Sequence, residues 1–390
     1  MKESINITLS QDEESLRFEE NLDEQAKQKI EKYKNVRIMH PTLSNTMSEV
    51  LKKYHAMEKG DFLFIAGSTG VGKSILGEQL KLHLLSQEID LMKSDRNYQP
   101  VVYQNAYQSD SSNFDFKLFY ENVSKKIGDI LPNEKQRIEY RQDGSIDISS
   151  LKKKKNTARE MRLDIEEGFL RRGTHTFFID EIQHMLAMRS HEKIKDRMDF
   201  IKSFTESANV KIIMIGTYEA LQMSGLSAQL GRRNLFVDFP RYKCETKEQL
   251  EEWIKVVWEC QRRLPLKDKE CLVPHYKMLF RFSCGCTGIL KKWINLALTD
   301  ALASSLETIT EEILLANRAP INTLDKIASE ICEGEKKLML QNADKLNALY
   351  DNANMDFPPH EKEKQSKPRN KQAEGLKPGE QKPKLMKTGR

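Results

Sequence analysis

Residues 62–74 read Phe62-Leu-Phe-Ile-Ala-Gly67-Ser-Thr-Gly-Val-Gly72-Lys73-Ser74, a short apolar run that leads directly into a glycine-rich loop. The apolar run predicts a buried strand, and apolar residues at helical spacing from residue 75 to 84 predict a helix after the loop. The loop matches the pattern G-x-x-x-x-G-K-[ST] in the strand–loop–helix context in which this pattern binds phosphate. Its backbone N–H groups and the positive end of the helix dipole would face phosphate oxygens.

The chemistry of such a loop indicates ATP and Mg²⁺ as the bound groups. Lys73 is expected to reach the β- and γ-phosphates, and the Ser74 hydroxyl is expected to ligate Mg²⁺. The whole loop is a candidate binding segment, with eight residues: Gly67, Ser68, Thr69, Gly70, Val71, Gly72, Lys73 and Ser74.

A second apolar run, Phe177-Phe-Ile-Asp180-Glu181, ends in two carboxylates. We expect a strand whose carboxyl end lies beside the phosphate loop. Asp180 would then hold Mg²⁺ through water, and Glu181 would act as the general base on the attacking water.

Three further elements are candidates for the same site. Thr217 ends the run Ile215-Gly-Thr217, and we expect its hydroxyl to face the γ-phosphate or the water from a strand between the first and third. Arg232 or Arg233 is expected to act as an arginine finger on a neighbouring subunit, because the pair directly precedes the fifth strand. Lys291, three residues after Gly288 at the start of a helix, is a candidate nucleotide contact.

Five apolar strands separated by helical segments predict an α/β fold with a parallel sheet covered on both faces. The expected strands lie at 62–66, 101–103, 176–179, 210–215 and 234–239. From Tyr242 onward the pattern is helical, with a capping box at Thr246–Gln249 and helices near 250–264, 270–282, 288–305, 310–317 and 323–350. Residues 1–30 are polar and are expected to contribute no core. Residues 133–157 suggest a charged loop insertion.

The chain of 390 residues carries a formal net charge of +5, which is unevenly distributed. Residues 1–24 carry a net charge of −6 and residues 356–390 a net charge of +5, so the body between them is about +6. The tail has almost no large apolar residue, and we expect it to be disordered. This pattern excludes a uniformly basic, histone-like protein.

No apolar stretch is long enough for a transmembrane helix, and the first residues do not resemble a signal peptide. We therefore expect an intracellular protein that does not bind membranes, with its six cysteines as free thiols. Cys284-Gly-Cys286 is the only close cysteine pair. Metal binding by this pair is the less favoured alternative, because zinc sites usually show CxxC or HxxxH spacing.

These elements in this order, followed by a helical lid, resemble an AAA+ ATPase. The finer resemblance is to the TnsC/TniB transposition regulators, and it covers roughly residues 35–320. It is carried by Phe178-Ile-Asp-Glu-Ile-Gln-His184, Ile213-Met-Ile-Gly-Thr217 and Leu230-Gly-Arg-Arg233, and also by Arg37-Ile-Met-His-Pro41. Lys291 departs from the pattern, because many AAA+ lids carry Arg there, and the 133–157 insertion has no counterpart in it.

We expect four segments: an acidic N-terminal extension at 1–34, an ATPase core at 35–242 that resembles AAA+ cores, a helical lid with C-terminal helices at 243–350 and a disordered basic tail at 351–390. The resemblance also implies head-to-tail assembly, as a ring or a helical polymer, on duplex DNA without sequence preference. Such a polymer links a target-selector protein to the transposase, and ATP hydrolysis disassembles it. The protein would then act in the bacterial cytoplasm, on DNA.

The DNA contacts are sited by charge and by position in the chain. Tyr107 and Lys117 lie in and beside the loop after the second strand, and they are the first candidates. The basic run Lys152, Lys153, Lys154 and Lys155 is a second candidate or a solvated loop. The tail is expected to touch DNA, to dock on a transposase or to remain a bare end.

Two other functions stay open on sequence alone. One is a different AAA+ ATPase, such as a helicase loader or a secretion-associated ATPase. The other is a nucleotide-gated scaffold that scarcely hydrolyses ATP. Glu181 and the arginine pair argue against the scaffold, because both serve turnover.

Overall fold

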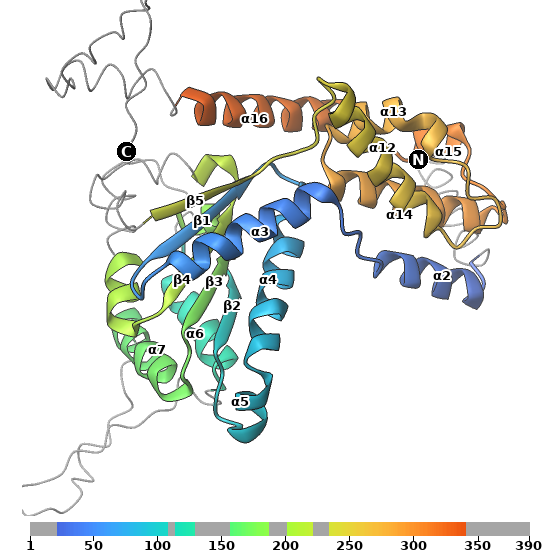
Figure 1. Cartoon of the computed structure of the whole chain (residues 1–390). Coiled ribbons are helices and arrows are strands. Elements are labelled where there is room, and N and C mark those ends of the chain that lie inside the picture. The colour runs from blue at the N-terminus through green and yellow to red at the C-terminus, as the bar shows by residue number, and fades with distance from the viewer. Residues whose placement is uncertain (1–21, 108–113, 129–156, 187–200, 221–233, 341–390) are drawn as a thin grey trace, which may run out of the picture. The chain divides into compact units, whose positions relative to one another are not determined.

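A five-stranded parallel sheet forms the centre of the fold (Figure 1). The computed structural model describes residues 22–107, 114–128, 157–186, 201–220 and 234–340. The strands lie in the order β2-β3-β4-β1-β5. Their bounds are β1 (Phe62–Gly67), β2 (Val101–Asn105), β3 (Thr176–Asp180), β4 (Lys211–Gly216) and β5 (Asn234–Phe239). The expected α/β fold class is confirmed, with its helical region after the fifth strand.

The register of the sheet brings the functional strand ends to one edge. Ala66 of β1 pairs with Gly216 of β4, and Asn105 of β2 pairs with Asp180 of β3. Because β4 lies between β1 and β3, the segment after Gly216 enters the space between the phosphate loop and Asp180. The predicted position of the Thr217 strand is therefore confirmed.

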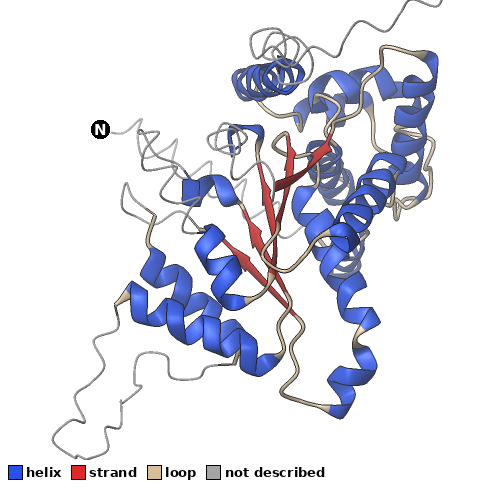
Figure 2. Cartoon of the chain, turned by 60° about the vertical axis from the view of Figure 1, so that its left-hand side comes forward, coloured by secondary structure: helices blue, strands red, loops and turns tan. Residues whose placement is uncertain are grey.

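Helices cover both faces of the sheet, as Figure 2 shows. One face carries α3 (Pro41–Ala56) and α4 (Lys73–Gln87), which is followed by α5 (Ile89–Ser94). The other carries α6 (Phe116–Lys126), α7 (Ala158–Arg172), α8 (Ile182–Leu186) and helical residues 201–208. Apolar side chains are needed on both faces of each strand, which explains why the strands are continuous apolar runs.

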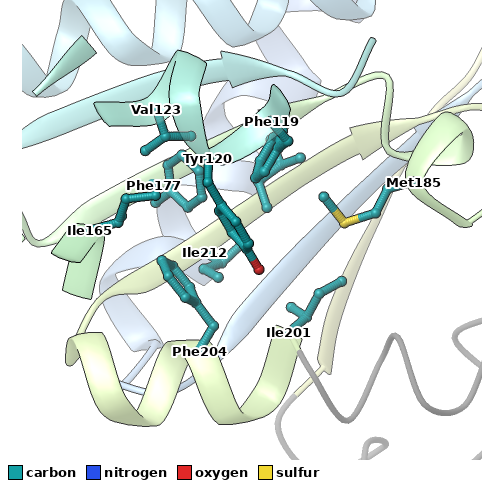
Figure 3. A pocket seen from close by; sticks show the side chains of 10 residues that line it. Phe119, Tyr120, Val123, Ile165, Phe177, Met185, Ile201, Phe204 and Ile212 are labelled. Atoms are coloured by element: carbon teal, nitrogen blue, oxygen red, sulfur yellow. The ribbon is translucent and has the colours of Figure 1, made fainter. Parts of the chain in front are cut away.

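Neighbouring phenylalanines in β3 show how the two faces are filled. Phe178 packs in the cluster formed with α3 and α4. Phe177 points to the other face, where its ring centroid lies 5.3 Å from that of Phe169 and 5.9 Å from that of Phe204. A cavity of about 10 Å³ remains between the rings of Phe177 and Phe204, Tyr120 of α6 and the sheet (Figure 3). Its lining is apolar apart from the Tyr120 hydroxyl.

The helices after β5 form a second hydrophobic cluster. They are α12 (Lys247–Arg262), α13 (Tyr276–Ser283), α14 (Thr287–Ala303) and α15 (Glu311–Ala316), and we call them the lid. Trp253 of α12 and Trp293 of α14 are fully or almost fully buried in this cluster. The predicted capping box is confirmed, because Thr246 and Gln249 cap the start of α12 reciprocally.

Helix α2 (Glu24–Lys34) contacts α14 of the lid. It buries Ala26 and Ile30, contrary to the expectation that residues 1–30 add no core, and it also buries Tyr33 just beyond them. The Tyr33 ring lies in the lid cluster, and its hydroxyl donates to the Cys260 carbonyl at 3.0 Å. The prediction was wrong because three buried side chains in a charged helix leave little mark on local composition. Their partners follow more than 200 residues later.

Helix α16 (Ile321–Leu340) is attached to the end of the sheet through two adjacent residues. A Cβ on Gly334 would lie 2.5 Å from Cδ2 of Tyr218, the residue after Thr217. Next to it, Glu335 accepts hydrogen bonds from Arg241 at 2.9 and 3.3 Å. The helix therefore needs a glycine at 334 in order to approach the Tyr218 ring.

Residues 1–336 form one compact unit and residues 337–390 a second, of which the structure describes only 337–340. The tail at 351–390 lies outside the described residues, as do Arg232, Arg233 and the run Lys152–Lys155. Of the 133–157 insertion, only residue 157 is described. None of the helices in the described ranges is long and apolar enough to cross a membrane. All six cysteines are free thiols.

Replacement of Gly334 tests the attachment of α16. The G334V variant places a branched side chain against the Tyr218 ring, and overpacking of this kind costs about 1–3 kcal/mol of unfolding free energy. Urea unfolding measures the loss. E333V adds the same side chain at the exposed neighbouring position and should lose less than about 0.5 kcal/mol. Equal losses in the two variants would contradict the close packing.

Candidate nucleotide site

The phosphate loop has the backbone that its sequence demands. Gly70 and Gly72 have φ values of +79° and +110°, a left-handed region that side chains other than glycine rarely adopt. Gly72 is the N-cap of α4 and supplies no side-chain hydrogen bond. The first N–H groups of α4 thus have no capping side chain and are free to bind an anion.

Lys73 lies inside this loop as a buried cation. Its Nζ donates to the carbonyl oxygens of Gly67 at 3.1 Å and Ser68 at 2.9 Å, and the residue is 6% exposed. Burial lowers the pKa of Lys73 from its ordinary value, although the nearby Glu181 and Asp180 carboxylates oppose the shift. A buried cation without a bonded carboxylate fits a site that receives an anion.

Asp180 ends β3 and is held by two hydrogen-bond donors. The Tyr103 hydroxyl donates to its Oδ2 at 2.7 Å, and the Glu181 N–H donates to its Oδ1 at 2.8 Å. The nearby Ser74 hydroxyl also lowers the pKa of this carboxylate. Burial raises the pKa of Asp180, and these hydrogen bonds oppose the shift. A carboxylate beside a hydroxyl provides the hard oxygen ligands that Mg²⁺ prefers, so the two residues fit such an ion.

Glu181 and Thr217 are joined by Gln183 of α8. The Gln183 Nε2 donates to Glu181 Oε2, and the Gln183 Oε1 accepts from the Thr217 N–H at 3.3 Å. Glu181 has a φ of +56°, an uncommon left-handed conformation that turns the chain sharply after Asp180. The buried Thr217 Oγ1 has no hydrogen-bond partner among the described residues. The site therefore contains a carboxylate in fixed orientation and a hydroxyl with unused hydrogen-bonding capacity.

The start of α14 lies directly on the phosphate loop. The Gly288 N–H donates to the Gly70 carbonyl at 2.8 Å, and the Thr287 hydroxyl donates to the Val71 carbonyl at 2.9 Å. Gly288 must be glycine here, because a Cβ would lie 2.6 Å from the Gly70 oxygen. Two outward-facing carbonyls of the loop are thus satisfied by the lid.

A pocket of about 230 Å³ extends from the phosphate loop along α14. Apolar side chains from residues 36–43, α4 and α12 line much of it, and this composition suits a flat aromatic base. Lys291 and Asn295 line the same pocket. The Asn295 Oδ1 is buried without a hydrogen-bond partner in the described part of the chain, so an acceptor is available for a base amino group.

Lys291 lines this pocket, but its amino group is also held by α2. Its Nζ donates to the Tyr33 carbonyl at 2.7 Å and lies 3.2 Å from the centroid of the Tyr33 ring. Burial lowers the pKa of Lys291 to about 8. The role of Lys291 as a nucleotide contact stays a prediction.

The structure brings together most of the sequence-predicted site. Lys73 lies near Asp180 and Glu181, and Gln183 is hydrogen-bonded to both Glu181 and Thr217. Lys291 lines the pocket that begins at Gly72 of the phosphate loop. The two described DNA candidates lie apart from it: Tyr107, which is 61% exposed, follows β2, and Lys117 is exposed on α6. Arg232 and Arg233 lie outside the described residues.

Sequence reasoning gave no role of their own to four residues that hold the site. They are Tyr103, Thr287, Gln183, which was quoted only within the resemblance, and Gly288, which was named only as the start of the Lys291 helix. Gln183 stands two residues after Glu181, and Gly288 opens a helix where glycine is a poor choice, so each carried a weak local signal. Tyr103 and Thr287 carried none, because the atoms they contact are distant in sequence.

Replacement of Thr287 tests the contact between the lid and the loop. T287V keeps the shape but removes the donor to the Val71 carbonyl. Loss of one such hydrogen bond is worth about 1 kcal/mol, so we expect a roughly fivefold increase in the Kd for ATP. T287S keeps the hydroxyl and should bind like the wild type. Isothermal titration calorimetry measures both, and a T287V protein with unchanged affinity would contradict the contact.

The pH dependence of ATP binding tests Lys291. An anion near the amino group favours its protonated form, so the affinity of the wild type should fall as the pH rises from 7 to 9, through the pKa of about 8. K291M should bind ATP more weakly at pH 7 and show a flatter profile. A K291M profile parallel to that of the wild type would exclude Lys291 as a contact.

The chain is similar to several solved structures and matches one family model over part of its length. No curated protein matches the chain. Among solved structures, the chain is similar to the ORC2 protein of Aeropyrum pernix in its ADPNP–ADP complexes, with 11% identity, 83% of this chain and 79% of that chain covered, and a TM-score of 0.45. It is also similar to Cdc6p from Pyrobaculum aerophilum, with 10% identity, coverages of 81% and 87%, and a TM-score of 0.44.

A third similar structure is domain III of the Thermotoga maritima replication initiation protein DnaA, with 15% identity, coverages of 72% and 92%, and a TM-score of 0.42. The family model described as an AAA domain matches residues 56–223, which include the phosphate loop, Asp180, Glu181 and Thr217. Residues 56–223 are therefore similar in sequence to AAA domains.

Proposed function

We propose that this protein is an ATPase that assembles head to tail on duplex DNA when ATP is bound and regulates DNA transposition. The proposed response to bound ATP rests on the arrangement around Thr217. Its unpartnered hydroxyl and the oriented Glu181 carboxylate flank one phosphate loop, and Gln183 connects them. A terminal phosphate placed there would contact both groups at once.

The residues of the site divide the work of hydrolysis. The N–H groups at the start of α4 and the Lys73 ammonium bind the phosphates and offset their charge. Ser74 and Asp180 would hold Mg²⁺, which supplies charge stabilisation at the phosphates. Glu181 accepts a proton from the attacking water, and Gln183 keeps its carboxylate in place. Thr217 donates to the terminal phosphate and so responds to its loss.

A neighbouring subunit is proposed to complete this site. The candidates are Arg232 and Arg233, of which one would neutralise charge that develops at the γ-phosphate. Each subunit would supply its arginine from one face and receive the neighbour's arginine at another. The contact therefore repeats head to tail and forms a ring or a helical polymer. Loss of the γ-phosphate removes a contact at that interface and favours disassembly.

The DNA and transposition parts of the proposal rest on the resemblance of residues 178–184, 213–217 and 230–233 to TnsC/TniB regulators. Tyr107 and Lys117 are proposed to face the duplex, together with the run Lys152–Lys155. Contacts to phosphates without base readout suit a polymer that marks many sequences. A transposase and a target selector are the proposed protein partners.

The E181Q variant tests the proposed response to bound ATP. Removal of the general base should lower ATP turnover by at least about 100-fold, since general-base catalysis contributes about 10²–10⁴-fold. Binding groups remain, so ATP should stay bound and polymers on duplex DNA should persist in electron micrographs. The wild type with ATP should disassemble as ATP is consumed. An E181Q protein that neither retains ATP nor assembles would contradict the mechanism.

Salt-dependent binding tests the duplex partner. With a non-hydrolysable ATP analogue, affinity for a labelled duplex should fall steeply as salt increases, because contacts to phosphates release counterions. Fluorescence anisotropy with and without nucleotide gives the comparison. Equal affinity without nucleotide, or no binding at any salt concentration, would remove the transposition function and leave an ATPase of another role.

A further inference from the structure

A polar cleft of about 610 Å³ lies at β2, outside the nucleotide site. Strand β2 is the first strand in the sheet order and pairs only with β3 among the described strands. Helices α4 and α6 both contact it, and the cleft is bounded by side chains from all three elements. Its walls are Glu78, Lys81, Tyr103, Gln104, Asn105, Tyr107, Asn122, Lys125 and Lys126.

The cleft is electropositive. Lys81, Lys125 and Lys126 form no ion pair with any residue in the described ranges. Among the described residues that line the cleft, the one acid is Glu78, and it is bonded to Arg37 at 2.7 Å, so its charge is already offset. Three cations around one hollow attract a polyanion.

The cleft also contains an aromatic ring and a buried amide, which a purely electrostatic binding site would not need. Tyr107 is 61% exposed at the cleft, and its hydroxyl accepts from Asn105 Nδ2 at 3.4 Å. Gln104 is 3% exposed, and its Nε2 donates to the Asn105 carbonyl at 2.9 Å. This bond fixes the amide orientation and leaves the Gln104 Oε1 without a partner among the described residues. A ligand N–H group would satisfy that oxygen.

We propose that this cleft binds single-stranded DNA. The three lysines contact phosphates, Tyr107 stacks on an unpaired base, and the Gln104 amide accepts from a base N–H group. Positive grooves with aromatic platforms are the usual means of binding single strands. Paired bases in a duplex offer no free face to Tyr107, and an acidic peptide uses the lysines but not the ring. This proposal shares Tyr107 with the proposed duplex contacts, but it differs in the partner, because stacking on Tyr107 requires an unpaired base.

Tyr103 connects the cleft with the nucleotide site. Its side chain lines the cleft, and its hydroxyl donates to Asp180 Oδ2 at 2.7 Å. A strand in the cleft therefore lies one side chain away from the carboxylate proposed to hold Mg²⁺. We expect single-stranded DNA to change the rate of ATP hydrolysis through this contact, an effect that rests on the proposed ATPase.

The first experiment measures binding of a labelled single-stranded oligonucleotide to the full chain by fluorescence anisotropy, without nucleotide. K125E/K126E should weaken binding at least about tenfold, because two attractive charges become repulsive. K27E/K29E makes the same charge change on exposed residues of α2 and should bind within about twofold of the wild type. Equal weakening in the two variants would show that net charge, not the cleft, binds the strand.

The second comparison isolates stacking. Y107A should weaken single-strand binding about tenfold, whereas Y107F keeps the ring and should bind like the wild type. Y107A with wild-type affinity would overturn the proposal. So would poly-glutamate that displaces the oligonucleotide as effectively as unlabelled strand does, because the cleft would then be a peptide site. Weakened binding of the matched duplex alone would assign the cleft to duplex DNA.

The Y103F variant tests the coupling alone. It should bind the oligonucleotide normally, while the ratio of ATPase rates with and without the strand should move to about one. A ratio equal to that of the wild type would overturn the coupling but not the cleft. Because binding is measured without nucleotide, its outcome is independent of the E181Q experiment on duplex DNA.

Discussion

The contact between the Gly288 N–H and the Gly70 carbonyl is the constraint on which the nucleotide site depends. It holds the start of α14 against the phosphate loop, which follows β1 of the sheet. The two backbones approach so closely that a Cβ at either Gly70 or Gly288 would clash. The pocket of about 230 Å³ lies beside that contact and is lined by α14 and by Ile75 of α4. The phosphate loop and the lid therefore line one pocket, although more than 200 residues separate them in the sequence.

Burial shifts the pKa values of the charged residues in the candidate site. Burial lowers the pKa of Lys73 and raises that of Asp180, so in each case it disfavours the charged form. A phosphate beside the lysine and a cation beside the aspartate would reverse both effects. The buried Thr217 hydroxyl and Asn295 amide oxygen have no partner among the described residues and would also gain one from a bound nucleotide. The site is therefore less stable than its surroundings until it binds a ligand.

Much of the fold and of the site followed from local patterns. Each strand was predicted because both of its faces are buried, and the phosphate loop because glycine spacing dictates its backbone. The expectation that residues 1–30 add no core was wrong, because Ala26 and Ile30 of helix α2 are buried and this helix contacts α14, more than 200 residues later in the sequence. Gln183, Thr287 and Tyr103 could not be predicted, because each acts through an atom that the fold brings to it. The cleft at β2 could not be predicted either, because the residues that line it come together only in the folded chain.

By itself, the sequence determined the class of chemistry: a phosphate loop, a strand ending in two carboxylates and a third strand ending in threonine. Short-range rules of hydrophobic periodicity and backbone conformation suffice for these features. Only the tertiary structure decided that Gln183 connects Glu181 with Thr217, that the lid rests on the loop and that three lysines share one cleft. Those contacts depend on sheet order and helix packing, and no local pattern along the chain encodes the distance between residues that meet in space.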